Sequence, residues 1–203
     1  MRVARRDLVK RAMDLAAAGS GLLLTSPLLF AASVAIIATD GRPVLFRQRR
    51  VGRGGTTFEI LKFRSMRNGA PGLQVSSDRD PRITRVGAVL RKTKVDELPQ
   101  LVNVLRGEMS VVGPRPEVPR YVEQWPEALR PTILSVRPGI TDPASIAFRD
   151  ESEILAASAD PEHTYLTEIL PQKAAMYADY VQKRTARGDL RIIADTVRAV
   201  VRR

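Results

Sequence analysis

The longest apolar stretch of the chain lies near its start. From Leu15 to Thr39 no residue carries a charge, and a helix of this length can cross the roughly 30 Å hydrocarbon layer of a membrane. Because positively charged flanks favour the cytoplasmic side, a straight transmembrane helix fits the pattern less well than an anchor with both ends in the cytoplasm. A signal peptide fits poorly, since the run is too long. The basic residues on the two sides are Arg2, Arg5, Arg6, Lys10 and Arg11 before the run, and Arg42, Arg47, Arg49, Arg50 and Arg53 after it.

A proline stands in the middle of this run. Pro27 removes one helical hydrogen bond and displaces the carbonyl of residue 23, so the helix should bend there. The hydroxyl of Ser26 or Thr25 can bond the freed carbonyls in lipid. We therefore expect a helix-break-helix hairpin that enters one leaflet and returns. The sequence divides into this membrane anchor, residues 1–40, and a cytoplasmic domain, residues 41–203.

The pattern after the anchor changes to short β-rich runs. Two of them surround the turn Arg53-Gly54-Gly55 and predict a hairpin. In the second run Phe58 and Ile60 alternate with a polar residue, but Leu61 and Phe63 are apolar too. This strand should be covered on both faces.

An amphipathic helix follows, with apolar residues at helical spacing from Leu98 to Leu105 and a stop near Gly107. Pro99 is tolerated in its first turn, where amide groups lack helical partners. Asp96 stands where an N-cap belongs, and Glu97 would suit the positive end of the helix. By spacing alone, a cap is the simplest interpretation of this acidic pair.

The remainder is proline-punctuated and then helical. Trp125 could rest on the lipid headgroups or pack in the core. Helices are expected from Pro161 to Arg203, and the last is basic and amphipathic, suited to the membrane surface, to a partner helix or to the core. The expected fold class is α+β: a re-entrant membrane helix, a small β-hairpin or sheet, and several amphipathic helices at the membrane interface.

Composition limits the chemistry. The chain has 33 Lys and Arg against 22 acidic residues, a net charge of +11, which favours anionic partners. The absence of Cys and a single histidine, His163, exclude thiol chemistry and multi-histidine metal sites. A nucleic-acid-binding protein would also be basic, but aromatic residues are 5% and no nucleic-acid-binding motif is present, so no nucleic acid is expected. A membrane-anchored scaffold remains a further alternative.

Four segments together resemble the bacterial sugar transferase family, the monotopic phosphoglycosyl transferases. They are "VLFRQRRVG", "FEILKFRSM", "VDELPQLVNVLRGEMSVVGPRP" and "RPGIT". The resemblance extends from the apolar segment nearly to the C-terminus, and it too implies a re-entrant helix. It departs after "RPGIT", where this chain reads "DPASIAFRDE".

The resemblance implies a reaction and a location. A phosphosugar would move from a UDP-sugar to a polyprenyl (undecaprenyl) phosphate at the cytoplasmic face of the bacterial inner membrane, releasing UMP and starting glycoconjugate or polysaccharide assembly. Membrane phospholipids would surround the anchor, and a homodimer is a possible assembly. Which UDP-sugar is used does not follow.

It also implies the site. Asp96 and Glu97 match the family's catalytic dyad, with Asp96 as nucleophile in ping-pong transfer and as ligand of a Mg²⁺ cofactor. Phosphate-binding candidates are Lys62 and Arg115, which match basic motif positions, followed by Arg64, Arg91 and Arg137, each of which alone could equally be a surface charge. Asp142 could contact the sugar or uridine, or only cap a loop.

Overall fold

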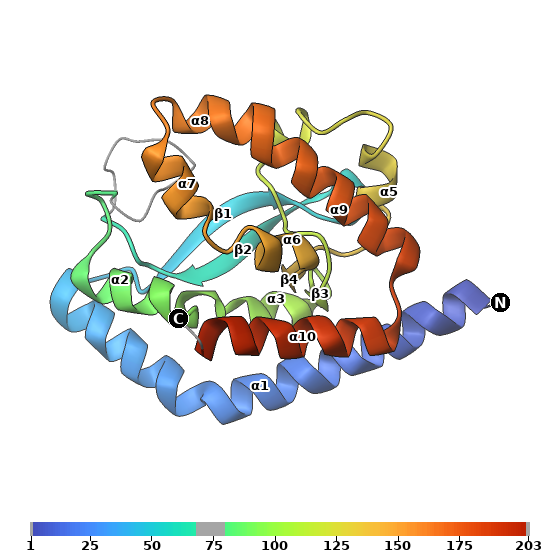
Figure 1. Ribbon diagram of the computed structural model, residues 1–203. Coiled ribbons are helices and arrows are strands. Elements are labelled where there is room, and N and C mark those ends of the chain that lie inside the picture. Colours follow the sequence, from blue (N-terminus) through green and yellow to red (C-terminus); the bar gives the residue numbers. More distant parts are fainter. Residues whose placement is uncertain (1, 68–79, 202–203) are drawn as a thin grey trace.

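The computed structural model describes residues 2–67 and 80–201 of the chain (Figure 1). It is a mixed, helix-rich fold with two small sheets, as the α+β prediction required. The strands are β1 (Leu45–Val51), β2 (Thr57–Phe63), β3 (Ser110–Val112) and β4 (Gly139–Thr141). The helices are α1 (Arg2–Asp40), α2 (Arg85–Lys92), α3 (Gln100–Arg106), α4 (Pro119–Val122), α5 (Arg130–Leu134), α6 (Pro143–Ala147), α7 (Glu151–Ala157), α8 (Pro161–Thr164), α9 (Leu170–Lys183) and α10 (Ala186–Val201), with single turns η1 (Arg53–Gly55), η2 (Val95–Glu97) and η3 (Tyr165–Ile169).

The N-terminal apolar run forms one bent helix. α1 continues through Pro27 without interruption, so the expected break is a bend, and in Figure 1 both arms of α1 rise from the bend toward the rest of the chain. Pro27 has no amide hydrogen to offer the carbonyl of Leu23. The Ser26 hydroxyl donates to that carbonyl instead, at 2.8 Å. The side chain predicted to relieve the proline defect therefore does so.

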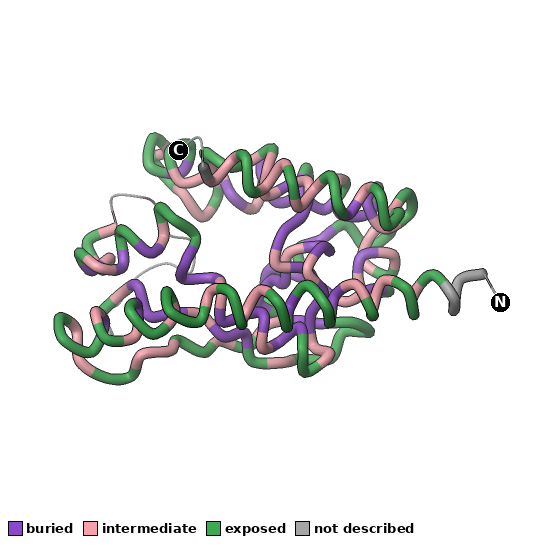
Figure 2. Tube along the Cα trace, turned by 90° about the horizontal axis from the view of Figure 1, so that it is seen from below, coloured by how far each residue is buried: buried purple, intermediate pink, exposed green. Residues whose placement is uncertain are grey.

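Much of α1 lies on the outside of the molecule (Figure 2). Leu23, Leu24 and Phe30 are each more than 70% exposed, at 76%, 79% and 72%. The helix is long and apolar enough to cross a membrane. Large apolar side chains left uncovered on such a helix are typical of a surface that contacts a membrane or another protein.

Each arm of α1 still packs against the domain through buried apolar residues. Ala18 joins a cluster with Ile60 of β2 and Leu101 of α3. Ala32 and Ile36 join a second cluster with Phe63, Leu90 and Val95. The second cluster connects the anchor directly to the turn that holds the acidic pair.

The predicted hairpin is present. β1 pairs with β2 in antiparallel register, and Gly54 and Gly55 turn the chain with φ values of 67° and 80°. Ile60, Leu61 and Phe63 are all buried, which confirms that β2 is covered on both faces. α1 and α3 cover one face through Ile60.

The acidic pair does not cap a helix, contrary to the expectation from spacing. Val95, Asp96 and Glu97 form the single turn η2, and α3 begins only at Gln100, after Pro99. The cause is Lys94, whose φ of 58° places it in the left-handed region. A reversal there turns the chain before the helix starts and directs both carboxylates into the interior.

A second sheet was not predicted. β3 and β4 pair in parallel, with Ser110 opposite Gly139. Just beyond this pairing the backbones approach so closely that a Cβ added to Gly139 would lie 2.1 Å from the nitrogen of Gly113. Only glycine permits this approach, and it fixes the start of the "GPRP" segment.

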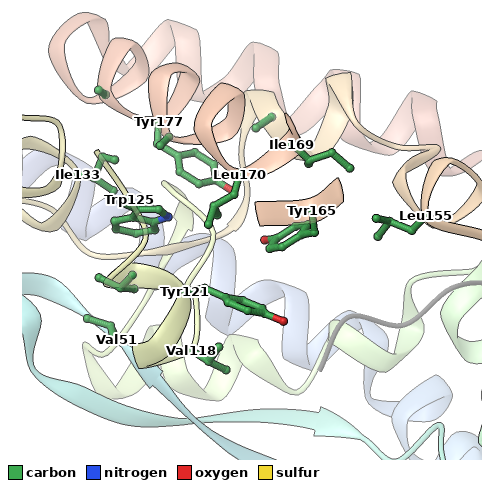
Figure 3. Packing of buried hydrophobic residues seen from close by; sticks show 14 residues of the cluster. Val51, Val118, Tyr121, Trp125, Ile133, Leu155, Tyr165, Ile169, Leu170 and Tyr177 are labelled. Carbon is green, nitrogen blue, oxygen red and sulfur yellow. The ribbon is translucent and has the colours of Figure 1, made fainter. Parts of the chain in front are cut away.

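The chain is helical from residue 161 onward, as expected. In Figure 1 α8 and α9 lie on the side of the domain away from α1, and α10 returns to lie beside α1. Trp125 is 4% exposed and lies against Tyr177 of α9, with ring centroids 6.3 Å apart (Figure 3). Core packing is thus the correct interpretation of the single tryptophan. α10 buries Asp189 and bonds β4 through the hydroxyls of Thr196 and Thr141, which are 2.6 Å apart.

Candidate active site

The site is built on η2. Val95 packs against α1, and the left-handed Lys94 precedes it, so the turn is held from both sides. Asp96 and Glu97 are consequently buried, at 6% and 9% exposure. Two adjacent carboxylates inside a protein are costly unless cations or hydrogen bonds compensate them.

Glu97 receives that compensation from two basic side chains. Lys62 Nζ lies 3.0 Å from Glu97 Oε1, and Arg115 spans both oxygens, with contacts of 2.6 Å and 3.4 Å. Burial alone would raise the pKa of Glu97, but the charges of Arg115 and Lys62 outweigh it and hold that pKa well below its usual range. Glu97 in turn raises the pKa of Arg115 well above normal. Glu97 is therefore ionised, and its carboxylate holds Lys62 and Arg115 in place.

Asp96 differs from its neighbour. Its Oδ1 is buried and has no hydrogen-bond partner among the described residues. Burial, followed by the negative charge of Glu97, raises the pKa of Asp96, while Lys62, Lys94 and Arg91 oppose the rise. An unpaired carboxylate oxygen in such a place is unusual in a folded protein. It is free to bind a cation or to attack an electrophile.

The donor set suits a hard divalent cation. Mg²⁺ is typically held by one or two carboxylates together with substrate phosphates, rather than by a cage of protein ligands. Within residues 2–67 and 80–201 no group of three or more His, Cys, Asp or Glu side chains could hold a metal. The unpaired Asp96 oxygen fits a Mg²⁺ ion held by one carboxylate together with substrate phosphates.

The structure brings most of the predicted basic residues together. Lys62 and Arg115 meet at Glu97, and the charge of Arg91 acts on Asp96. Asp142 is fully buried and caps α6 by accepting from Ser145 N at 2.8 Å, so its capping role is real. Its charge also helps to raise the pKa of Arg115, so Asp142 lies near the site.

Arg64 and Arg137 lie elsewhere. Arg64 is buried and donates to the carbonyls of Asp40 and Gly41, both at 2.7 Å, where it holds the end of α1. Arg137 donates to Gly107 O at 2.8 Å, beyond the end of α3. Neither contacts Asp96 or Glu97 directly.

Sequence reasoning missed a second buried ion pair beside the site. Arg50 lies 3.3 Å from Glu117, which also accepts a hydrogen bond from Tyr165 at 2.8 Å. Burial lowers the pKa of Arg50, and the nearby charge of Arg115 lowers it further. Arg50 lies in one of the segments that carried the resemblance, "VLFRQRRVG", and Glu117 directly follows another, which ends in "GPRP". Nothing in their spacing showed that they would pair.

Fold and site together fit the class of phosphate-transferring enzymes: a buried carboxylate pair with phosphate-compatible cations lies against a long apolar helix. The chain belongs to the bacterial sugar transferase family, whose sequence profile matches residues 5–203.

Characterised relatives agree with this assignment. A UDP-glucose:undecaprenyl-phosphate glucose-1-phosphate transferase of Caulobacter vibrioides is 39% identical over 94% of this chain and 69% of its own length. An enzyme of the same name from Escherichia coli is 36% identical, over 94% of this chain but 39% of its own length. A UDP-N-acetylgalactosamine-undecaprenyl-phosphate N-acetylgalactosaminephosphotransferase of Aeromonas hydrophila is 45% identical over 68% of this chain and 34% of its own. The chain thus spans well under half the length of the last two relatives.

Proposed function

We propose that this chain transfers a sugar 1-phosphate from a UDP-sugar to a polyprenyl phosphate and releases UMP. The observation that carries the proposal is the unpaired, buried Oδ1 of Asp96 beside cations that Glu97 holds in place. The names of the relatives supply the substrate classes, a nucleoside diphosphate sugar and undecaprenyl phosphate. Because those names include both glucose and N-acetylgalactosamine, the donor sugar is left to a screen of UDP-sugars.

The reaction proceeds in two displacements. An oxygen of Asp96 attacks the sugar-linked phosphorus of the donor, a new P–O bond forms, and the bond to the UMP phosphate breaks, so UMP leaves with that electron pair. An oxygen of the polyprenyl phosphate then attacks the same phosphorus and frees the carboxylate. The acceptor oxygen is already anionic, so no general base is needed.

The basic residues reduce the repulsion between carboxylate and phosphates. Lys62 and Arg115 each use part of their donor capacity on Glu97, and the remaining N–H groups can bind phosphate oxygens. Mg²⁺, held by Asp96 and substrate oxygens, would neutralise further charge on the phosphates. Glu97 contributes by fixing the two cations rather than by attacking.

The anchor places this chemistry at the membrane. We propose that α1 is re-entrant, with both ends on the cytoplasmic face of the inner membrane, as its bend at Pro27 and its basic flanks favour. A lipid phosphate stays at the interface, so the soluble donor has to be brought to it. Labelling of a Met1→Cys variant by an impermeant reagent from outside intact cells would contradict this topology.

The direct test is an Asp96→Asn variant assayed for UMP release with UDP-sugar and polyprenyl phosphate. We expect loss of at least about 10³-fold, as for removal of other catalytic nucleophiles. Asp179→Asn is the matched control, because Asp179 is exposed and pairs only with Lys183 one helical turn away. Undiminished release by Asp96→Asn would eliminate the proposed mechanism.

A further inference from the structure

A charged hollow lies away from Asp96 and Glu97. The N-terminal arm of α1, the turn η1, the segment before β4 and the end of α9 enclose it, and neither member of the acidic pair lines it. An ion pair of 2.9 Å between Asp7 and Arg184 joins α1 to the end of α9 at its rim. The proposed reaction makes no use of this hollow.

The acidic residues of the hollow are already engaged. Asp7 pairs with Arg184, and Asp14 is buried and accepts from the hydroxyl of Ser110 and the amide of Val111, both at 3.0 Å. Lys10 lies 2.7 Å from Asp189 of α10. These contacts leave no carboxylate for the remaining cations.

Three arginines therefore form no ion pair with a carboxylate of the described residues. Arg11 and Arg137 donate only to backbone carbonyls at the end of α3, and Arg53 of η1 has no partner within the described part of the chain. They are close enough to repel one another: burial lowers the pKa of Arg137 and the charges of Arg11 and Arg53 lower it further, while Asp14 and Asp7 oppose the shift only in part. An anion between them would relieve this repulsion. Guanidinium groups bind phosphate oxygens in particular, since their N–H pairs match the geometry of phosphate.

The position of the hollow indicates where the phosphate comes from. Lys10 and Asp14 lie one to five residues before Leu15, where the apolar run begins, and hence within about 8 Å of it along the helix axis. The headgroup layer is roughly 5 to 7 Å thick on each side of the hydrocarbon core. If α1 enters the bilayer as proposed above, the hollow lies at the depth of the lipid phosphates.

We infer that Arg11, Arg53 and Arg137 form a binding site for the phosphate of an anionic phospholipid. Occupation would tie the N-terminal arm of α1, η1 and the segment before β4 to one headgroup. The bend of α1 would then be held at a fixed height relative to the catalytic carboxylates. This inference rests on the proposed membrane anchor but not on the covalent mechanism.

Full-length protein in detergent is titrated with dihexanoyl phosphatidylglycerol, with dihexanoyl phosphatidylcholine and with inorganic phosphate, and binding is measured by native mass spectrometry. We expect saturable binding of phosphatidylglycerol, weakened about fivefold or more in Arg53→Gln. Arg49→Gln is the matched control: Arg49 is exposed in the same hairpin, outside the hollow, and its loss should leave binding unchanged. Phosphatidylcholine and inorganic phosphate should bind more weakly.

Two results would overturn the inference. An equal loss in Arg49→Gln would show general charge attraction, and binding of inorganic phosphate as tight as that of phosphatidylglycerol would show a site for a soluble anion. UMP release is measured in parallel and should be unchanged in Arg53→Gln, because Arg53 does not touch the acidic pair. A wild-type protein that binds the lipid but releases no UMP would count against the proposed function alone.

Discussion

The ion pair between Arg115 and Glu97 offers the sharpest test of how the site is held. Removing one partner of a buried ion pair costs about 3 to 5 kcal/mol. Here Arg115 keeps 28% of its side chain exposed and Lys62 remains 3.0 Å from Glu97, so both solvent and the second cation reduce the cost. We expect Arg115→Met to lower the free energy of unfolding by about 2 to 3 kcal/mol, a fall in Tm of roughly 4 to 12 °C for a chain of this size.

Thermal unfolding in detergent, followed by circular dichroism, measures the effect. The same substitution is made in a Glu97→Gln background. There we expect it to lower the free energy of unfolding by less than about 1 kcal/mol, because the carboxylate charge that pairs with Arg115 is absent. Arg120→Met, a more exposed arginine whose side chain is 55% accessible, should change stability by no more than about 0.5 kcal/mol. If Arg115→Met costs the same in both backgrounds, the arginine acts by packing its stem, and the electrostatic account is wrong.

Three further predictions concern the frame of the site. Gly87→Ala should cost at least about 2 kcal/mol in the same unfolding assay, because its Cβ would lie 2.0 Å from the carbonyl oxygen of Ser65, whereas Gly19→Ala, with nothing within 4 Å, should not destabilise. Asn103→Ala should cost about 2 to 4 kcal/mol, since this buried amide bonds one carbonyl and one amide of β2 at 2.8 Å and 3.0 Å; a cost below 1 kcal/mol would refute that role. Because the pKa of Glu97 is lowered in the folded state, the stability that it contributes is full above an ordinary carboxyl pKa of about 4.3 and is lost as the pH falls through the lowered pKa. The difference in free energy of unfolding between wild type and Glu97→Gln should therefore be constant from pH 7 to about pH 4.5 and shrink below that. A difference that already shrinks at pH 6 would contradict the low pKa.

Local sequence rules predicted the elements whose causes are local. The hairpin follows from Gly54 and Gly55, and the bend of α1 from Pro27 with Ser26 beside it. The same rules gave the wrong role for Asp96, because Lys94 adopts a left-handed backbone conformation. That conformation is rare for residues other than glycine, and no neighbouring residue in the sequence predicts it. The cap assignment was the ordinary outcome of the pattern, and the tertiary fold overrode it.

Contacts between segments far apart in the chain could not be predicted from local sequence rules. The parallel pairing of β3 with β4 joins segments far apart in the chain, and neither three-residue strand is distinctive. The basic candidates show the same limit: Lys62 and Arg115 converge on Glu97, whereas Arg64 holds the end of α1 and Arg137 lines the hollow beside the N-terminal arm of α1. Which arginine reaches a phosphate depends on distances that spacing does not encode.

The central claim is that Asp96 becomes esterified to phosphate during turnover. The most direct measurement incubates the purified protein with a UDP-sugar and Mg²⁺ in the absence of polyprenyl phosphate and determines its intact mass after rapid quenching. Wild type should gain the mass of one sugar phosphate with release of one UMP per protein, and Asp96→Asn should gain none. UMP release that occurs only when the lipid acceptor is present, with no adduct at any time, would contradict the account.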